Sequence, residues 1–318
     1  MGGGYIKNEA LLKKVFIFLI IALCVLSFSC SGSGGGGSSD NPETSDPVSA
    51  TPWLCFIAKD ATCTVSTKCF LRGTIDSVIP TIMYSIDDGE TWYDFNFSYY
   101  SWISGNLETA GSTVTLRNGE KVYIRAKDKN VIFSKINGGN NYLEISFKFT
   151  GIIAASGNVM SLLDKDCKTT TIPCNSCFFR LFRDCTSLTE APELPSTSLT
   201  THCYSGMFEN CTSLTKAPDL PATTLTDDCY VSMFENCTSL TKAPELPATT
   251  LATNCYASMF KDCHALKYIN AHFNDWGTST NLWVQNVSPS GLFTCPYELP
   301  ESFNGSRMPH GWTVQRLP

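Results

Sequence analysis

Hydrophobic and polar positions follow three different patterns along the 318-residue chain, and each pattern predicts a different structure. Residues 15–28 form a short apolar run. Between residues 52 and 150, short stretches alternate between apolar and polar residues, which is typical of half-buried β-strands. After residue 177, apolar residues return at a fixed spacing of 26 positions. The sequence therefore predicts a leader, a β domain and a repeat region.

The apolar run has the layout of a secretory signal. Two lysines precede it, and its 14 residues are too few to cross about 30 Å of hydrocarbon as a helix. It ends at residues 26–30, Leu-Ser-Phe-Ser-Cys, which resembles a bacterial lipobox with serine where leucine is usual. Cys24 is a rival lipid acceptor, but the preceding Leu23 is too large. We predict a lipoprotein signal peptide over residues 1–29 and lipidation of Cys30, the alternative being plain secretion with an incidental cysteine.

Residues 30–51 are rich in glycine and serine and then in proline, aspartate and serine. This composition predicts a flexible tether that holds a folded body away from a surface.

Residues 52–150 contain several strand signals. The predicted strands are Trp53–Ala58, Ile79–Ile86, Trp92–Phe97 and Tyr142–Thr150. Short strands with frequent turns over about one hundred residues predict an immunoglobulin-like β-sandwich.

A hairpin is predicted around Asn118-Gly119, which lies between two alternating segments. A two-residue loop would set apolar residues opposite polar ones. A three-residue loop pairs Leu116 with Glu120 and Val114 with Val122. We therefore expect Gly119 in the left-handed region, beside a bulge.

One motif in this region is specific. Ser85, Asp87, Gly89, Thr91 and Trp92 match the Asp-box pattern S-x-D-x-G-x-T-W at every fixed position. The serine and aspartate oxygens can accept hydrogen bonds from the turn backbone, glycine suits a left-handed position, and tryptophan is expected to pack into the core. Asp-boxes are familiar from sialidases, where they lie away from the active site. A single copy predicts a structural hairpin.

The repeat region is marked by three sets of residues that each recur every 26 positions: Cys177, Cys203, Cys229 and Cys255; Cys185, Cys211, Cys237 and Cys263; and Phe182, Phe208, Phe234 and Phe260. This period, with leucine at fixed offsets, is a leucine-rich-repeat signature. Three full coils and a fourth that degenerates after Tyr268 predict repeats over residues 177–273. A lead-in over 151–176 and a cap over 274–318 complete the predicted solenoid.

The repeat offsets also predict which residues face outward. Thr215–Ala217 is expected to be a short strand stopped by Pro218, and Cys203–Phe208 a helical or 3₁₀ turn on the opposite side. The residues expected to point inward are Met207, Phe208, Cys211, Leu214, Ala217, Leu220 and Leu225. Two exposed columns form the candidate partner-binding face: Glu190, Lys216, Lys242 and Tyr268, and beside them Glu193, Asp219 and Glu245. The overall prediction is a mainly β chain with short helical turns.

Composition narrows the functions. The chain is 43% hydrophobic and 16% charged, which excludes disorder throughout. Its net charge of −6 becomes 20 − 28 = −8 without residues 1–29, which argues against nucleic acid as a partner. The four histidines lack zinc spacing, and Cys174–Cys177 is an isolated C-x-x-C pair. We therefore predict no catalytic residues, metal or cofactor, and mostly free thiols in the two cysteine columns.

The repeat C-Y-x-x-M-F-x-x-C-T-S-L-T-x-A-P-x-L-P-A-T-T-L resembles that of the BspA-like leucine-rich-repeat surface proteins of gut Bacteroidales. Residues 154–163 resemble the lead-in to their first repeat, residues 283–314 resemble their C-terminal tail, and the Asp-box hairpin fits their N-terminal β domain. The resemblance covers residues 53–318. Residues 63–80 look like an insertion relative to the family, and residues 165–174 also depart from it.

The resemblance implies a surface protein, lipid-anchored in the outer membrane and facing outward, with no catalytic residues. Two functions remain open. The first is adhesin-like binding of a host or bacterial surface protein through the repeat face. The second is glycan binding by the β domain, with Tyr99, Tyr100 and Trp102 as platforms for sugar rings. The same aromatic run is equally expected of a core strand.

Overall fold

The computed structural model describes residues 52–72, 79–101, 103–130, 132–136 and 142–317, which belong to one compact unit spanning Ser49–Pro318. The predicted mainly β class is confirmed, because these residues form sixteen strands and one 3₁₀ helix, η1 (Val159–Leu162). The predicted signal peptide, Cys30 and most of the tether lie outside the described residues.

The first sheet has the strand order β12-β11-β1-β8-β3-β4. The bounds are β1 Leu54–Ala58, β3 Ile82–Ser85, β4 Tyr93–Asp94, β8 Lys121–Ala126, β11 Ile153–Ser156 and β12 Leu188–Glu190. All neighbours are antiparallel except β11 and β12, which are parallel. The parallel pair joins this sheet to the first repeat.

The second sheet has the order β6-β5-β2-β10-β9, and β7 pairs with β2. The bounds are β2 Cys63–Arg72, β5 Ser98–Tyr100, β6 Leu107–Thr109, β7 Val114–Leu116, β9 Lys135–Ile136 and β10 Tyr142–Thr150. Residues 63–72, the first half of the predicted insertion over residues 63–80, form β2. Buried residues alternate along β2 from Cys63 to Cys69, so this strand supplies one whole row of the core.

The two sheets face each other across a shared hydrophobic core. Phe56 of β1 lies edge-on to Phe147 of β10, with ring centroids 4.9 Å apart. Phe147 also stacks on Phe182 of the first repeat at 5.5 Å. A single cluster of buried residues therefore runs from the two sheets into the repeats.

The predicted hairpin at Asn118-Gly119 is wrong in its pairing. β7 pairs with β2 in the second sheet, while β8 pairs with β1 and β3 in the first. The turn therefore carries the chain from one sheet to the other. Burial of Val114, Leu116, Val122 and Ile124 does not distinguish the two arrangements, since both direct these side chains into the same core. Gly119 does have the expected positive φ, +83°.

Successive coils stack with the predicted 26-residue offset. The phenylalanine column Phe182, Phe208, Phe234 and Phe260 has centroid spacings of 5.4, 5.6 and 5.7 Å. The tyrosine column Tyr204, Tyr230 and Tyr256 has spacings of 6.0 Å. Leu214, Leu220 and Leu225 are buried as predicted, and Ala217 is half-buried.

The buried cysteines act as small hydrogen-bonding residues. The Cys211 thiol donates to the carbonyl oxygen of Phe182 at 3.1 Å, and Cys237 and Cys263 make the same bond to the preceding coil. Burial raises the pKa of Cys263 to about 12. All fourteen cysteines among the described residues are free thiols.

The prediction of a helical or 3₁₀ turn over Cys203–Phe208 is wrong. Residues at 202, 206 and 210 have positive φ values, which no right-handed helix allows. N–H groups of alternate residues from His202 to Asn210 donate to carbonyl oxygens 25 residues ahead in the next coil, at 2.7–3.2 Å. The intervening residues close i→i+3 turns within their own coil. We call this side of the stack the turn face.

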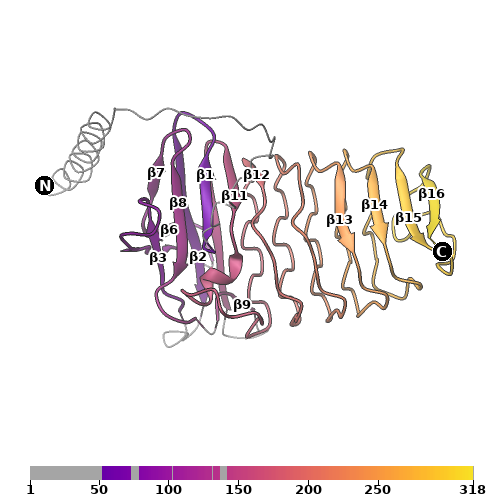
Figure 1. Ribbon diagram of the computed structural model, residues 1–318, viewed down its shortest axis with the longest axis horizontal. Coiled ribbons are helices and arrows are strands. Elements are labelled where there is room, and N and C mark those ends of the chain that lie inside the picture. The colour runs from indigo at the N-terminus through magenta and orange to yellow at the C-terminus, as the bar shows by residue number, and fades with distance from the viewer. Residues whose placement is uncertain (1–51, 73–78, 102, 131, 137–141, 318) are drawn as a thin grey trace, which may run out of the picture. The chain divides into compact units, whose positions relative to one another are not determined.

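Parallel strand pairing continues beyond residue 273, the predicted end of the repeats. A parallel sheet, β13-β14-β15-β16, runs from the repeats into the region expected to be a cap, at the C-terminal end of the stack in Figure 1. Its strands are β13 Lys242–Leu246, β14 Tyr268–Ala271, β15 Leu292–Pro296 and β16 Thr313–Leu317. Two shorter coils therefore follow Phe273. The expected aromatic residues Trp276, Trp283, Phe293 and Trp312 are buried within these coils.

The predicted lead-in over residues 151–176 contains β11 and η1. β11 lies between β1 and β12, and the Phe147 N–H donates to the Leu181 carbonyl at 2.8 Å. Both N-terminal sheets therefore make backbone hydrogen bonds to the first coil.

The turn face generates a matched pair of substitutions. Gly206 and Ser232 occupy the same repeat position, with φ values of +60° and +51°. A Cβ on Gly206 would lie 3.1 Å from Arg180 Cγ and from Glu209 Oε2. We expect Gly206→Ser to lower the free energy of unfolding by about 1 kcal/mol, and Ser232→Gly to raise it by about 0.5 kcal/mol. Urea unfolding measures both. Equal effects of the same sign would contradict this account.

Candidate functional site

The first predicted column lies exposed on the strand side of the stack, which we call the strand face. Glu190 bridges to Lys216 in parallel register, and Lys242 pairs with Tyr268 across β13 and β14. All four side chains are exposed, and Tyr268 retains 51% of its surface. In the second coil, the predicted strand Thr215–Ala217 is reduced to the single bridge at Lys216.

The second column, Glu193, Asp219 and Glu245, is exposed beside the first. Glu245 lies opposite Asn270, and the Asn270 amide donates a hydrogen bond to its carboxylate. The His272 imidazole lies 3.8 Å from the same carboxylate. Next to the position where the first three coils carry a carboxylate, the fourth coil therefore carries Asn270 and His272, which approach the Glu245 carboxylate.

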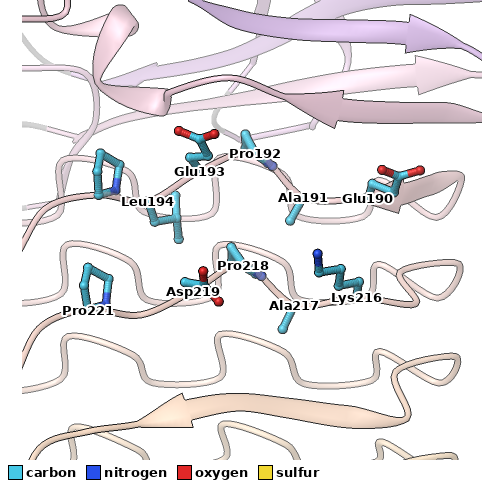
Figure 2. Close-up of a pocket in the computed structure, with 11 residues that line it drawn as sticks. Glu190, Ala191, Pro192, Glu193, Leu194, Lys216, Ala217, Pro218, Asp219 and Pro221 are labelled. Carbon is cyan, nitrogen blue, oxygen red and sulfur yellow. The ribbon is translucent and has the colours of Figure 1, made fainter. Parts of the chain in front are cut away.

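A groove of about 420 Å³ lies between the first and second coils on the strand face. Glu190 and Lys216 lie at one end and Pro221 at the other (Figure 2). The rest of its lining comes from Ala191, Pro192, Glu193, Leu194, Pro195, Ala217, Pro218 and Asp219. All four predicted column residues of these two coils are charged groups of this groove.

The charges of the groove are available to a ligand. Three carboxylates, of Glu190, Glu193 and Asp219, stand against one ammonium group, that of Lys216. None of these four side chains forms an ion pair with another residue in the described part of the chain. The prolines offer rigid apolar surface between them. Such a groove can bind a partner that carries both apolar and charged groups.

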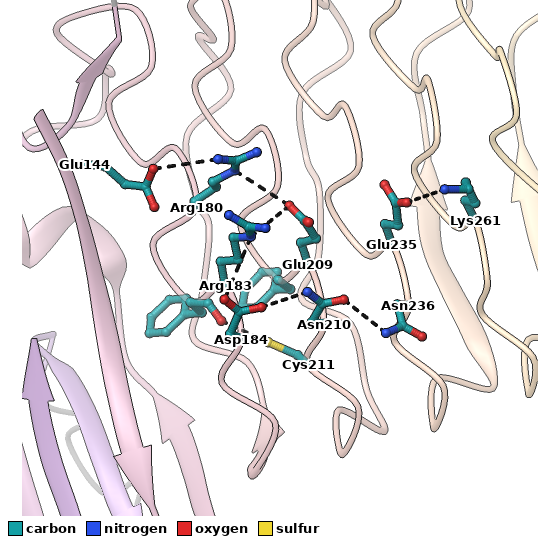
Figure 3. A network of polar contacts seen from close by, with 12 residues as sticks. Glu144, Arg180, Arg183, Asp184, Glu209, Asn210, Cys211, Glu235, Asn236 and Lys261 are labelled. Carbon is teal, nitrogen blue, oxygen red and sulfur yellow. Dashed lines mark hydrogen bonds and ion pairs between the residues drawn. The ribbon is translucent and has the colours of Figure 1, made fainter. Parts of the chain in front are cut away.

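The turn face carries a different kind of polar cluster, which the sequence analysis missed. Arg180 lies between Glu144 of β10 and Glu209 of the second coil, at 3.7 Å from each (Figure 3). Arg183 lies 3.3 Å from Glu209. Burial raises the pKa of Glu209, while the two arginines act in the opposite direction. These charges neutralise one another and tie β10 to the first two coils.

An amide ladder lies next to this cluster. The Asn210 amide donates to Asp184 at 2.7 Å and the Asn236 amide donates to Asn210 at 3.0 Å. Asn286 makes the same bond to Asp262 at 2.7 Å. All five residues have positive φ, a conformation that aspartate and asparagine tolerate better than most residues. The recurrence of Asp or Asn every 26 residues from Asp184 to Asp262 was the signal available in the sequence.

The Asp-box closes the turn between β3 and β4. Ser85 Oγ donates to Asp87 Oδ1 at 2.6 Å and accepts from the Gly89 N–H at 3.0 Å. The Thr91 N–H donates to Asp87 Oδ1 at 2.9 Å. Burial raises the pKa of Asp87, but these hydrogen bonds outweigh it and leave the pKa below its usual value.

Trp92 does not enter the core as expected. It is half-buried, its ring lies 5.0 Å from that of Trp53, and the Arg125 guanidinium covers it at 3.9 Å. Trp92 Nε1 also donates to the Gly89 carbonyl at 2.9 Å. The tryptophan therefore fastens the turn to the start of β1, which is a structural role.

The aromatic run at Tyr99 is divided between core and surface. Tyr99 and Tyr100 are half-buried on β5, while Trp102 lies outside the described residues. Tyr99 packs against the core and also lines a second cavity of about 470 Å³, beside Asp94, Asn96 and Lys127. The Lys127 ammonium lies 2.9 Å from Asp94.

The described residues contain no group of three or more His, Cys, Asp or Glu side chains that could hold a metal ion. His202 and His264 contact Asp228 and the Asn286 carbonyl, respectively, within the stack. No helix in the described part of the chain is long and apolar enough to cross a membrane.

Comparisons with protein-family models, with curated proteins and with solved structures find no match to this chain.

The Asp-box geometry predicts a pH-dependent stability effect. We expect Ser85→Ala to lower the free energy of unfolding by about 1–2 kcal/mol at pH 7, because the Gly89 N–H and the Asp87 carboxylate lose their partner. Because the pKa of Asp87 is lower in the folded protein, its ionised carboxylate stabilises the fold at pH values above its pKa in the unfolded chain, about 3.9. This stabilisation is lost as the pH falls through the pKa of Asp87 in the folded protein. The difference between the variant and the wild type should therefore shrink below about pH 4.

Urea unfolding at pH 7 and at pH 3 measures this effect. Ser239→Ala is the control, since the Ser239 hydroxyl makes no hydrogen bond to another described residue. A constant difference between the two pH values would show that Ser85 does not act through Asp87.

Proposed function

We propose that this protein is a non-enzymatic cell-surface lipoprotein that binds protein partners through the strand face of a leucine-rich-repeat solenoid. The observation that carries the proposal is the groove between the first two coils, where unpaired charges of both signs surround a row of prolines. A polypeptide offers matching charged and apolar groups along its length, whereas a sugar ring favours an aromatic platform.

The finer fold assignment is part of the same proposal. The 26-residue offset, the buried leucines and the parallel strands β13–β16 support a leucine-rich-repeat solenoid. Two facing sheets support an immunoglobulin-like sandwich whose first sheet continues into the solenoid. The repeat sequence supports membership of the BspA-like surface proteins, for which adhesive roles are the expectation.

The experiment begins with a screen of host matrix proteins and bacterial surface proteins against the purified chain. A protein ligand found in this way is then measured against the double variant Lys216→Glu/Lys242→Glu. We expect its affinity to change by about tenfold or more at low ionic strength, because reversed charges at an interface alter both encounter and dissociation. Surface plasmon resonance at two salt concentrations provides the measurement.

The matched control is Lys59→Glu/Lys121→Glu, which makes the same charge change at exposed positions of the β region. This control should bind as the wild type does. Unchanged binding by Lys216→Glu/Lys242→Glu, with circular dichroism showing a normal fold, would remove the strand face as the site.

A second function, glycan binding by the β region, rests on the 470 Å³ cavity lined by Tyr99. Its aromatic ring lies beside a carboxylate, an amide and an ammonium group, which is a combination suited to a sugar. A glycan array distinguishes the two functions. Glycan binding that Tyr99→Ala abolishes and Lys216→Glu/Lys242→Glu leaves intact would favour this second function over the first.

The proposed location is the outer membrane, with Cys30 acylated and the folded body facing outward. We expect Cys30→Ala to yield soluble or unprocessed protein, because the mature chain then loses its acyl chains. Membrane fractionation with mass analysis of the N-terminus tests this expectation. Membrane retention of fully processed Cys30→Ala would contradict the lipid anchor.

A further inference from the structure

Cys174 departs from the repeat pattern at a defined position. The residues 26, 52 and 78 positions later are Thr200, Thr226 and Ala252, so only the first of these four coils carries a cysteine here. In the second coil, the N–H of Cys203 donates to the carbonyl of Thr200 and closes the corresponding turn. The packing of the coil therefore does not require a thiol at residue 174.

The local backbone brings Cys174 close to Cys177. Asn175 and Ser176 form a turn between them, and Ser176 has a φ of +58°. Residues that flank such a turn have Cα atoms less than about 7 Å apart, within the range of about 4.4–6.8 Å that a disulfide spans. The turn is held by two hydrogen bonds to the second coil, Ser176 N–H to Thr201 O at 2.9 Å and Thr200 Oγ1 to Cys174 O at 2.7 Å.

We propose that Cys174 and Cys177 form a thiol–disulfide exchange site that reacts with disulfides of low-molecular-weight thiols. Cys174 is half-buried and therefore keeps part of its surface in solvent, while Cys177 is fully buried. The accessible cysteine is the attacking group and the buried cysteine is the resolving group.

The electrostatic setting supports this assignment. The side-chain hydrogen bond from Cys177 lowers the pKa of Cys174, and the Phe133 backbone and the Lys135 charge act in the same direction against burial. Burial raises the pKa of Cys177. A thiolate is the attacking species in thiol–disulfide exchange, so the partly accessible sulfur is also the one more readily ionised.

The exchange proceeds in two steps. The Cys174 thiolate attacks one sulfur of the disulfide R–S–S–R, the S–S bond breaks, and RS⁻ leaves and takes up the proton that Cys174 lost. Cys177 then loses its proton and attacks the Cys174 sulfur of the mixed disulfide, which releases a second RS⁻ that takes up this proton. The protein has gained one disulfide, and its two electrons have reduced R–S–S–R to two RSH.

Cys167 provides an internal comparison. It is half-buried like Cys174, but burial and the neighbouring Asp164 and Asp166 raise its pKa to about 11. It also lacks a second thiol three residues away. A reaction governed by exposure alone would modify both cysteines equally.

The first measurement is alkylation of the folded full-length chain with iodoacetamide at pH 7.5–8, followed by peptide mapping. We expect Cys174 to react at least about tenfold faster than Cys167, and the two rates to converge after denaturation. Equal rates in the folded protein would overturn the proposal.

The second measurement uses oxidised glutathione as the probe. Wild-type protein should acquire a Cys174–Cys177 disulfide, and Cys177→Ser should accumulate one glutathione on Cys174. Cys174→Ser should leave Cys177 unmodified, while the control Cys167→Ser should form the Cys174–Cys177 disulfide at the wild-type rate. A wild-type protein that accumulates glutathione on Cys174 without forming the internal disulfide would overturn the resolving role of Cys177. The absence of any modification at Cys174 would overturn the site as a whole.

Discussion

The whole repeat region depends on where the backbone N–H groups of the turn face find acceptors. A buried backbone N–H group without an acceptor costs free energy. A coil that does not form a helix cannot pair all of its N–H groups with its own carbonyl groups. Alternate residues solve this by donating to the following coil, and the residues between them close turns. This alternation forces left-handed backbone at every fourth position, such as His202, Gly206 and Asn210. Glycine, serine, asparagine and aspartate fill most of these positions as a result, and Arg180, His202 and Leu282 are exceptions.

The same constraint explains why the β region and the repeats form one body. The first coil must also find partners on its other side. β11 offers β12 a parallel neighbour, and the Phe147 N–H reaches the Leu181 carbonyl. The two N-terminal sheets thus take the place that a separate cap would occupy, and the core continues through Phe147 and Phe182. Removing either part would expose apolar surface on the other.

The sequence predicted the features that repeat and missed those that depend on a single contact. Periodicity located the inward leucines and the exposed columns, because stacked coils place the same repeat position in the core, or on the surface, of every coil. It did not reveal the sheet change at Asn118-Gly119, since Val114 and Val122 are buried with either pairing. It assigned a cap after Phe273 because the coil length shortens there, although β15 and β16 keep the parallel pairing. At the site, the exposed column residues were predicted from the repeat. The groove was not predicted, because its shape depends on how the first and second coils lie relative to each other.

The amide ladder divides between the third and fourth coils. The Asn236 amide donates to Asn210, but the Asp262 carboxylate has no N–H to donate onward to Asn236. It accepts from the Asn286 amide instead and so begins a second short ladder. A duplicated 26-residue unit carrying asparagine, added within the first ladder, would extend that ladder and leave the second intact. The near-identity of residues 207–225 and 233–251 gives recombination a matching template for such a duplication. A unit added between the second and third coils in this way would therefore leave both ladders unbroken.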